Sequence, residues 1–124
     1  MRYYVSELQN SGYDVQQRRT PDDALETLKE DADSFDLIIL DSSMPRGKRY
    51  TNQATEEGTL TGSLLFKDIK MMYPKIPILI LTNFSGLDWV QAESNTPRVL
   101  AAAKLDFTPS KLVEAVGTMI KNAQ

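Results

Sequence analysis

The sequence contains neither cysteine nor histidine, and these two absences exclude several kinds of chemistry. Without cysteine there is no disulfide framework, and without either residue there is no thiolate or imidazole metal site. Any bound metal must therefore be held by oxygen ligands, which favours Mg²⁺, Ca²⁺ or Mn²⁺. The missing histidine also excludes the Ser–His and Cys–His pairs that activate nucleophiles in many hydrolases.

Long apolar runs and an excess of basic residues are missing as well. No apolar stretch approaches the ~20 residues that a helix needs to span a bilayer, and Met1–Tyr4 does not begin a signal peptide. We therefore expect no membrane contact and a cytoplasmic location. The formal charge of −3 and the pI near 4.9 argue against direct nucleic-acid binding, because no stripe of basic residues is available to neutralise phosphates.

What the chain does contain is the composition of one ordinary globular domain. Its 124 residues are 41% hydrophobic and 25% charged, which suits a single core. Helical and strand patterns alternate along the chain, and together they predict about five helices and four strands. The predicted strands are 13–18, 36–40, 76–82 and 99–103, and the predicted helices are 2–11, one that begins at Pro21, 64–72, a weak one at 86–94, and one from Pro109 to the C-terminus.

The predicted strand Leu37–Leu40 is apolar at every position, so both faces of its sheet must be covered. Alternating strands and helices with right-handed crossovers then give an α/β fold, a doubly wound parallel sheet with helices on both faces. The chain begins with a helix, as though one strand had been removed from the front.

Three of these strands end in polar residues, Asp41, Thr82 and Lys104. The carboxyl ends of parallel strands form the edge where open α/β sheets bind ligands. A carboxylate, a hydroxyl and an ammonium at that edge are suited to receive a phosphoryl group, since the carboxylate can attack phosphorus while the other two bind its oxygens. Taken alone, such an aspartate is more often a turn or cap residue, and the threonine and the lysine are each unremarkable; only the set of three points to a site.

The segment Phe35–Pro45, with the sequence FDLIILDSSMP, resembles the phosphoacceptor segment of bacterial response-regulator receiver domains. Pro77–Thr82 is similar to their strand with the switch hydroxyl, and Lys104 followed by Phe107 resembles their terminal lysine region. Matches ahead of Phe35, in Gly12–Val15 and Pro21–Leu25, extend the resemblance over nearly the whole chain.

The resemblance implies a single receiver-like domain over residues 1–124 with a flavodoxin-like fold. It implies that Asp41 accepts a phosphoryl group from the phosphohistidine of a sensor histidine kinase or phosphotransfer protein, in a two-component phosphorelay. Thr82 and Lys104 would contact the phosphoryl oxygens, and Asp41 with the backbone carbonyl of Ser43 would bind Mg²⁺. Such a domain is a phosphoacceptor rather than an enzyme, and it relays its signal through contacts with a downstream protein target.

One departure from the family is large. Receivers carry an acidic pair at the end of a first strand to hold Mg²⁺, and this sequence has neither that strand nor that pair. We therefore expect weak or absent Mg²⁺ binding, unless Glu56 or Glu57 substitutes. Two explanations remain open, since Met1 is either an internal start or the start of a naturally truncated chain. In the family's strand order, 2-1-3-4-5, the missing first strand lies between the second and third strands. Without it, the predicted strand 13–18 would either pair directly with 36–40 or leave a gap in the sheet. An exposed, unpaired edge of this kind favours a homodimer or strand exchange.

Two further features leave the function open. A polar, aperiodic insertion at about 46–61 lies beside the predicted site, as a partner-specific flap or a spacer. The missing acidic pair also allows an alternative, a pseudo-receiver that acts as a phosphorylation-independent interaction module. A phosphatase with a DxD motif is disfavoured, because Ser43 stands where the second aspartate would be.

Overall fold

The computed structural model describes residues 2–41, 61–82, 98–104 and 107–123. These residues form four α-helices, one short 3-10 helix and three strands. In chain order they are α1 (Arg2–Asn10), α2 (Pro21–Asp31), η1 (Ala32–Ser34), β1 (Ile38–Asp41), α3 (Thr61–Met72), β2 (Ile78–Thr82), β3 (Val99–Ala103) and α5 (Pro109–Ala123). None of the described helices is long and apolar enough to cross a membrane.

The three strands form one parallel sheet in the order β1-β2-β3. Ile38 is paired with Ile78 at the start of β1, and Ile78 is paired in turn with Val99. All five residues of β2 are buried, whereas β1 and β3 are only partly covered. The middle strand therefore forms the centre of the sheet.

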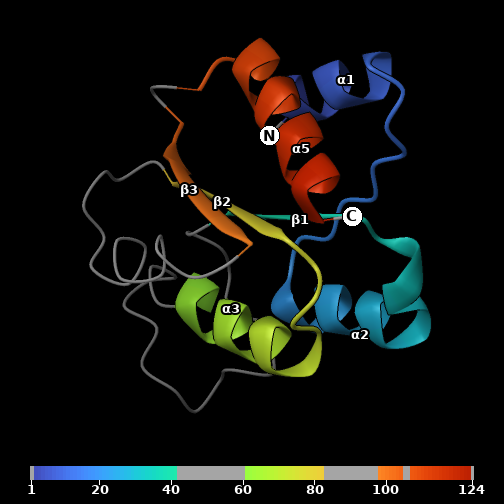
Figure 1. The fold of residues 1–124 in the computed structure, drawn as a ribbon. Helices are drawn as coiled ribbons and strands as arrows, with labels where there is room; N and C mark the ends of the chain where they lie inside the picture. Colours follow the sequence, from blue (N-terminus) through green and yellow to red (C-terminus); the bar gives the residue numbers. More distant parts are fainter. Residues whose placement is uncertain (1, 42–60, 83–97, 105–106, 124) are drawn as a thin grey trace.

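Helices cover both faces of the sheet, as the sequence predicts for a doubly wound fold. Figure 1 shows α1 and α5 on one side of the strands and α2 and α3 on the other. The side chains of β2 alternate between these layers, because successive residues of a strand point to opposite faces. Ile78 and Ile80 pack in the cluster with α2 and α3, and Leu79 and Leu81 pack in the cluster with α1 and α5.

Local signals explain where the helices begin and end. The Thr20 hydroxyl accepts a hydrogen bond from the Asp23 amide at 3.2 Å, and Pro21 occupies the first turn of α2. The Thr108 hydroxyl accepts from the Lys111 amide at 3.2 Å in the same way at the start of α5. Past the end of α1, Gly12 has a φ of 96°, a left-handed conformation that favours glycine.

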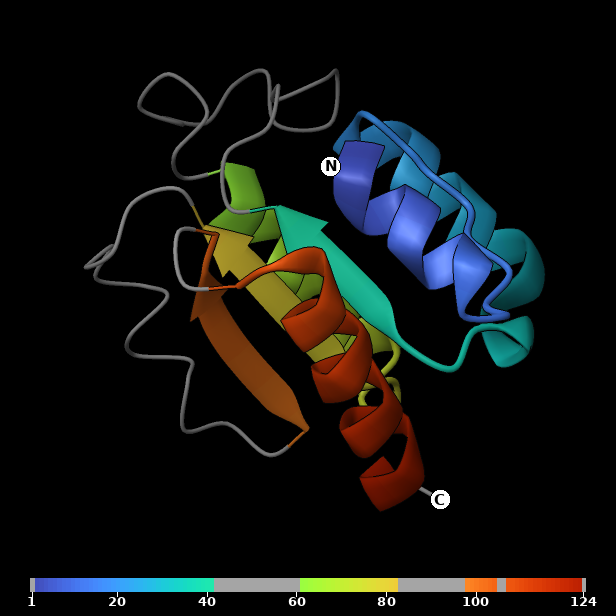
Figure 2. The same ribbon diagram turned by 90° about the horizontal axis from the view of Figure 1, so that it is seen from above.

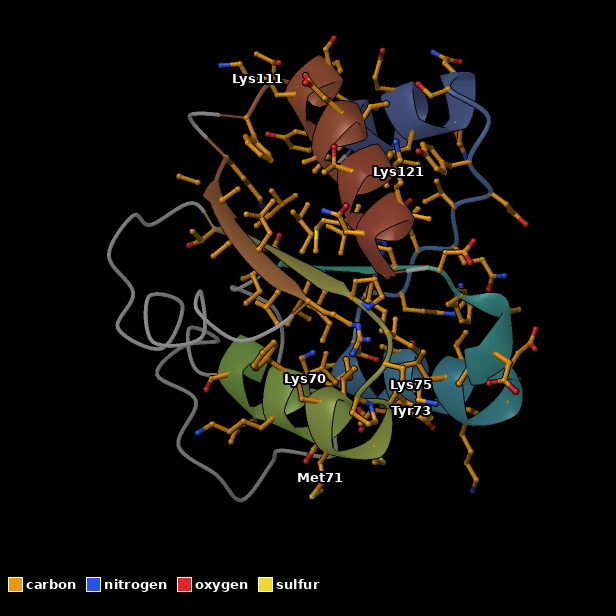
Figure 3. All side chains as sticks on the ribbon, viewed as in Figure 1. Lys70, Met71, Tyr73, Lys75, Lys111 and Lys121 are labelled. Carbon is orange, nitrogen blue, oxygen red and sulfur yellow. The ribbon has the colours of Figure 1, made fainter. Side chains whose placement is uncertain are left out.

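The outer surfaces of the helices carry charged and flexible side chains. Lys111 and Lys121 lie on α5, and Met71 lies on α3 (Figure 3). Met71 points away from the sheet and is 76% exposed. Polar groups from separate strands meet instead at the carboxyl ends of the strands.

The prediction of a strand at 13–18 is wrong. These residues form no strand, and Tyr13 and Val15 pack instead against the apolar cluster between the sheet and the helices α1 and α5. Apolar and polar residues alternate in the segment because only one side of it packs against this cluster. The alternative in which this segment pairs directly with 36–40 is therefore not found, and no described strand pairs with the outer edge of β1. The predicted helix at 86–94 and residues 46–60 of the predicted insertion lie outside the described residues, and residue 61 begins α3.

Candidate functional site

The register of the sheet brings the three predicted site residues to one edge. Asp41 ends β1 opposite Leu81, so Thr82 is the next residue along β2. Thr82 is paired with Ala103, and Lys104 follows directly after β3. Asp41, Thr82 and Lys104 therefore lie at the carboxyl ends of three adjacent strands, as the sequence predicts.

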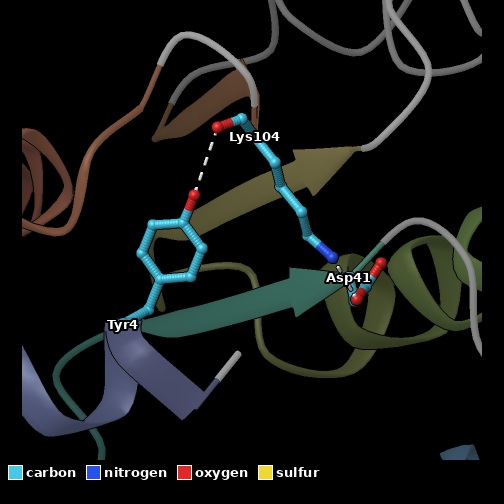
Figure 4. Close-up of polar contacts among 3 residues, drawn as sticks. All are labelled: Tyr4, Asp41 and Lys104. Carbon is cyan, nitrogen blue, oxygen red and sulfur yellow. Dashed lines mark hydrogen bonds and ion pairs between the residues drawn. The ribbon is translucent and has the colours of Figure 1, made fainter.

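Asp41 and Lys104 form an ion pair across this edge. The Lys104 Nζ donates to the Asp41 Oδ2 at 2.7 Å (Figure 4). The two residues come from the outer strands, so the lysine side chain reaches past the end of β2 to meet the carboxylate. The side chains are 18% and 27% exposed for Lys104 and Asp41, which leaves the pair partly shielded from water but open to a small reagent.

Thr82 lies between the two partners in the sheet and is 3% exposed. Its carbonyl oxygen accepts a hydrogen bond from the Lys104 amide at 2.8 Å. This bond continues the pairing of β2 and β3 by one residue and fixes where the lysine leaves the sheet. The backbone of Thr82 thus positions Lys104, and its side chain occupies the centre of the edge.

A fourth residue, Tyr4 on α1, contacts the same region. Its hydroxyl lies 2.7 Å from the Phe107 carbonyl oxygen and 3.2 Å from that of Lys104. From the sequence, Tyr4 is only a residue of the predicted helix 2–11. Nothing in the sequence indicates this contact, because the partners are separated by 100 and 103 residues.

The described residues do not fit a divalent metal ion at this edge. Within the described ranges, no group of three or more acidic side chains is placed to hold a metal ion, and the Asp41 carboxylate already binds the Lys104 ammonium. Mg²⁺ needs several oxygen ligands in near-octahedral geometry, and one paired carboxylate does not supply them. The predicted carbonyl ligand of Ser43, and Glu56 and Glu57, lie outside the described residues, so the predicted role of Ser43 stays a prediction.

The arrangement has a defined chemical capacity. Asp41 offers a carboxylate oxygen at the surface as a nucleophile, and the Lys104 ammonium is in place to attract an anionic reagent to it. An ammonium held beside the attacked group also stabilises negative charge that builds up on transferred oxygens. The edge is therefore suited to accept an anionic electrophile such as a phosphoryl group.

The fold is that of response-regulator receiver domains. The chain is similar to the receiver domain of NtrX from Brucella abortus (16% identity, TM-score 0.73), over 95% of this chain and 87% of that one. It is also similar to a CheY-like receiver from Methanospirillum hungatei (17% identity, TM-score 0.74, covering 97% and 83%) and a receiver protein from Sinorhizobium medicae (21% identity, TM-score 0.70, covering 98% and 85%). No protein-family model matches the sequence, and no curated protein matches it. The predicted flavodoxin-like fold is confirmed.

Proposed function

We propose that the chain is a two-component signalling domain in which Asp41 accepts a phosphoryl group from a phosphohistidine. The observation that carries this proposal is the 2.7 Å pair between Asp41 and Lys104 at the carboxyl edge of a receiver fold. The donor would be a sensor histidine kinase or a phosphotransfer protein. The phosphorylated domain would pass its signal on through contact with a downstream protein.

The reaction is a single transfer. An Asp41 carboxylate oxygen attacks phosphorus, the phosphorus–nitrogen bond of the donor breaks, and the leaving imidazole takes up a proton. The product is an acyl phosphate on Asp41. The Lys104 ammonium moves from the carboxylate to a phosphoryl oxygen, and the Thr82 hydroxyl, at the next strand end, binds another. Because the sequence lacks the acidic pair with which receivers hold Mg²⁺, we expect transfer to be slow and to change little when divalent ions are chelated.

The test uses phosphoramidate, a small donor with the same phosphorus–nitrogen bond. We expect intact-mass spectrometry to show one added phosphoryl group on the starting protein and none on the Asp41→Asn variant. Asp36→Asn is the matched control, since Asp36 is an exposed aspartate at the other end of the same segment, and it should be labelled normally. An unlabelled starting protein, or a labelled Asp41→Asn variant, would contradict the proposal.

A second function is favoured by one observation. Within the described part of the chain, no group of three or more acidic side chains is placed to hold a metal ion, which suits an interaction module that signals without phosphorylation. Such a module would take up no phosphoryl group from phosphoramidate. It would also bind beryllofluoride with Mg²⁺ poorly, and tight, Asp41-dependent binding measured by calorimetry would exclude it.

A further inference from the structure

Tyr4 joins the first helix to the loop that carries Lys104. Its hydroxyl lies 2.7 Å from the Phe107 carbonyl oxygen and 3.2 Å from the Lys104 carbonyl oxygen, and the second contact is drawn in Figure 4. A tyrosine hydroxyl has one proton to donate, so the shorter contact is the principal hydrogen bond and the longer one shares the same proton.

Other bonds hold the same stretch of backbone. The Lys104 amide donates to the Thr82 carbonyl at 2.8 Å, and the Phe107 amide donates to the Lys104 carbonyl at 3.3 Å. Lys104 is thus attached to β2 through its amide and to α1 through its carbonyl. Its side chain leaves from a backbone that is held on both sides.

The Tyr4 hydroxyl is itself held in place by packing. The Tyr4 side chain packs against the apolar cluster that contains Leu8 of α1 and Leu112 and Val116 of α5. The two helices are in extensive contact, so the ring is fixed by both of them. The hydrogen bond therefore attaches the loop to a tyrosine whose own position is set by α1 and α5.

A fixed backbone matters for a lysine more than for most residues. The side chain is long and flexible, and holding it in one geometry costs conformational entropy. The 2.7 Å contact with Asp41 requires the lysine side chain to be held in such a geometry. Fixing the carbonyl of Lys104 limits where Nζ can go and favours that geometry.

We propose that Tyr4 is a positioning residue, whose hydroxyl keeps the Lys104 ammonium on Asp41. Its effect on phosphoryl transfer rests on the function proposed above, but its effect on the ion pair does not. The proposal also makes α1 a part of the site, although the helix contributes no group that touches the reacting atoms.

The experiment measures the chemical reactivity of Lys104 in the full chain. The protein is treated briefly with a small amine-reactive ester, and the acylation of each lysine is quantified by mass spectrometry. Lys75, which is exposed, serves as the internal reference. An amine in an ion pair reacts slowly, and the Asp41→Asn variant gives the rate of Lys104 without its partner.

We compare Tyr4→Phe with Tyr13→Phe, which removes the same atom from another tyrosine packed against the same cluster. Within the described part of the chain, no hydrogen bond is recorded for the Tyr13 hydroxyl. We expect Tyr4→Phe to raise the acylation rate of Lys104 about two- to tenfold, toward the rate in Asp41→Asn, which is the range expected for losing one partly buried hydrogen bond. Tyr13→Phe should leave the rate unchanged.

Lys70 is the control for general loosening, because it is partly buried on α3, on the opposite face of the sheet. Its rate should be the same in all the proteins. The proposal is overturned if Tyr4→Phe leaves Lys104 unchanged, if Tyr13→Phe has an equal effect, or if Lys70 becomes reactive in parallel. Failure of Asp41 to accept phosphate, with Lys104 still responding to Tyr4→Phe, would refute the proposed function and leave the positioning role intact.

Discussion

The Asp41–Lys104 pair is more than an ordinary surface contact, because both side chains are less than one-third exposed. Fully exposed pairs contribute little, since water screens them and two flexible chains must be ordered. Partial burial strengthens the attraction, and the backbone bonds around Lys104 reduce the ordering that is left to the side chain. The pair should therefore contribute measurably to folding stability.

A double-mutant cycle tests this contribution. We expect Asp41→Asn and Lys104→Met to show a coupling of about 1 kcal/mol in the free energy of unfolding, decreasing with added salt. Urea unfolding of the four proteins provides the measurement. As the control, Asp41→Asn with Lys121→Met should be additive, because Lys121 lies near the far end of α5 (Figure 3). Additivity of the first cycle would mean that the pair contributes nothing.

Lys70, on α3, is the described residue whose charge is most clearly disfavoured by folding. Burial lowers the pKa of Lys70 from its usual value of 10.5, and the nearby Arg98 guanidinium lowers that pKa further. The folded state therefore binds the Lys70 proton less tightly than the unfolded state does. Consequently, stability should increase as the pH rises from the lowered pKa toward 10.5.

Removing the guanidinium should partly reverse this shift. We expect Arg98→Gln to raise the pKa of Lys70 without restoring it fully, because burial is the larger cause. Titration of the Lys70 Cε signal by NMR measures the change. Arg18→Gln is the control, since Arg18 is exposed and hydrogen-bonded to Thr27 of α2. An unchanged or lower Lys70 pKa in Arg98→Gln would show that Arg98 does not act on it.

Among the elements, those with strong local signals could be predicted from the sequence. The apolar runs gave β1 and β2, and a threonine cap followed by proline marked the starts of α2 and α5. The segment 13–18 could not be predicted correctly, because strand formation depends on a neighbour that the local pattern does not contain. Its two apolar side chains, Tyr13 and Val15, serve packing against helices equally well.

For the site, too, one part of the arrangement could be predicted from the sequence and another part could not. Asp41 and Lys104 could be brought together in advance, because parallel strands end at one edge and the order of the strands follows from the crossovers. The contact of Tyr4 with the loop could not, since it depends on how α1 packs against α5. Side-chain contacts between distant elements have no local sequence signal.

The central strand should dominate the stability of the sheet that positions the site. Ile80 in β2 is fully buried, and we expect Ile80→Ala to cost about 2–5 kcal/mol in the free energy of unfolding. Leu100 in β3 is 37% exposed, so Leu100→Ala should cost less than about 1 kcal/mol. Urea unfolding compares the two variants. Equal costs would contradict the central place of β2.

At the scale of the whole molecule, the outer edge of β1 is one of the two edges of the described sheet. No described strand pairs with that edge, and α1 and α2 lie beyond it on the side away from β2 (Figure 2). The Ile38 amide donates to Pro77, so the amide of Ile39 points toward the open edge. Unpaired edges of this kind attract another strand.

We propose that this edge takes part in self-association. Light scattering should show a species larger than the monomer at concentrations of about 100 μM, and dilution should dissociate it. Ile39→Pro removes an edge donor without removing a bond to β2, and it should weaken the association. Circular dichroism checks that this variant keeps its helices. A strictly monomeric starting protein at that concentration would contradict the proposal.

The central claim is that Asp41 receives a phosphoryl group, and its most direct test identifies the modified atom. After treatment with phosphoramidate, borohydride reduces an acyl phosphate to an alcohol, and this change marks the carboxylate that carried phosphate. The account predicts that peptide mass spectrometry finds the reduced side chain at Asp41 alone, with Asp36 unmodified. Reduction at another carboxylate, or at none, would contradict it.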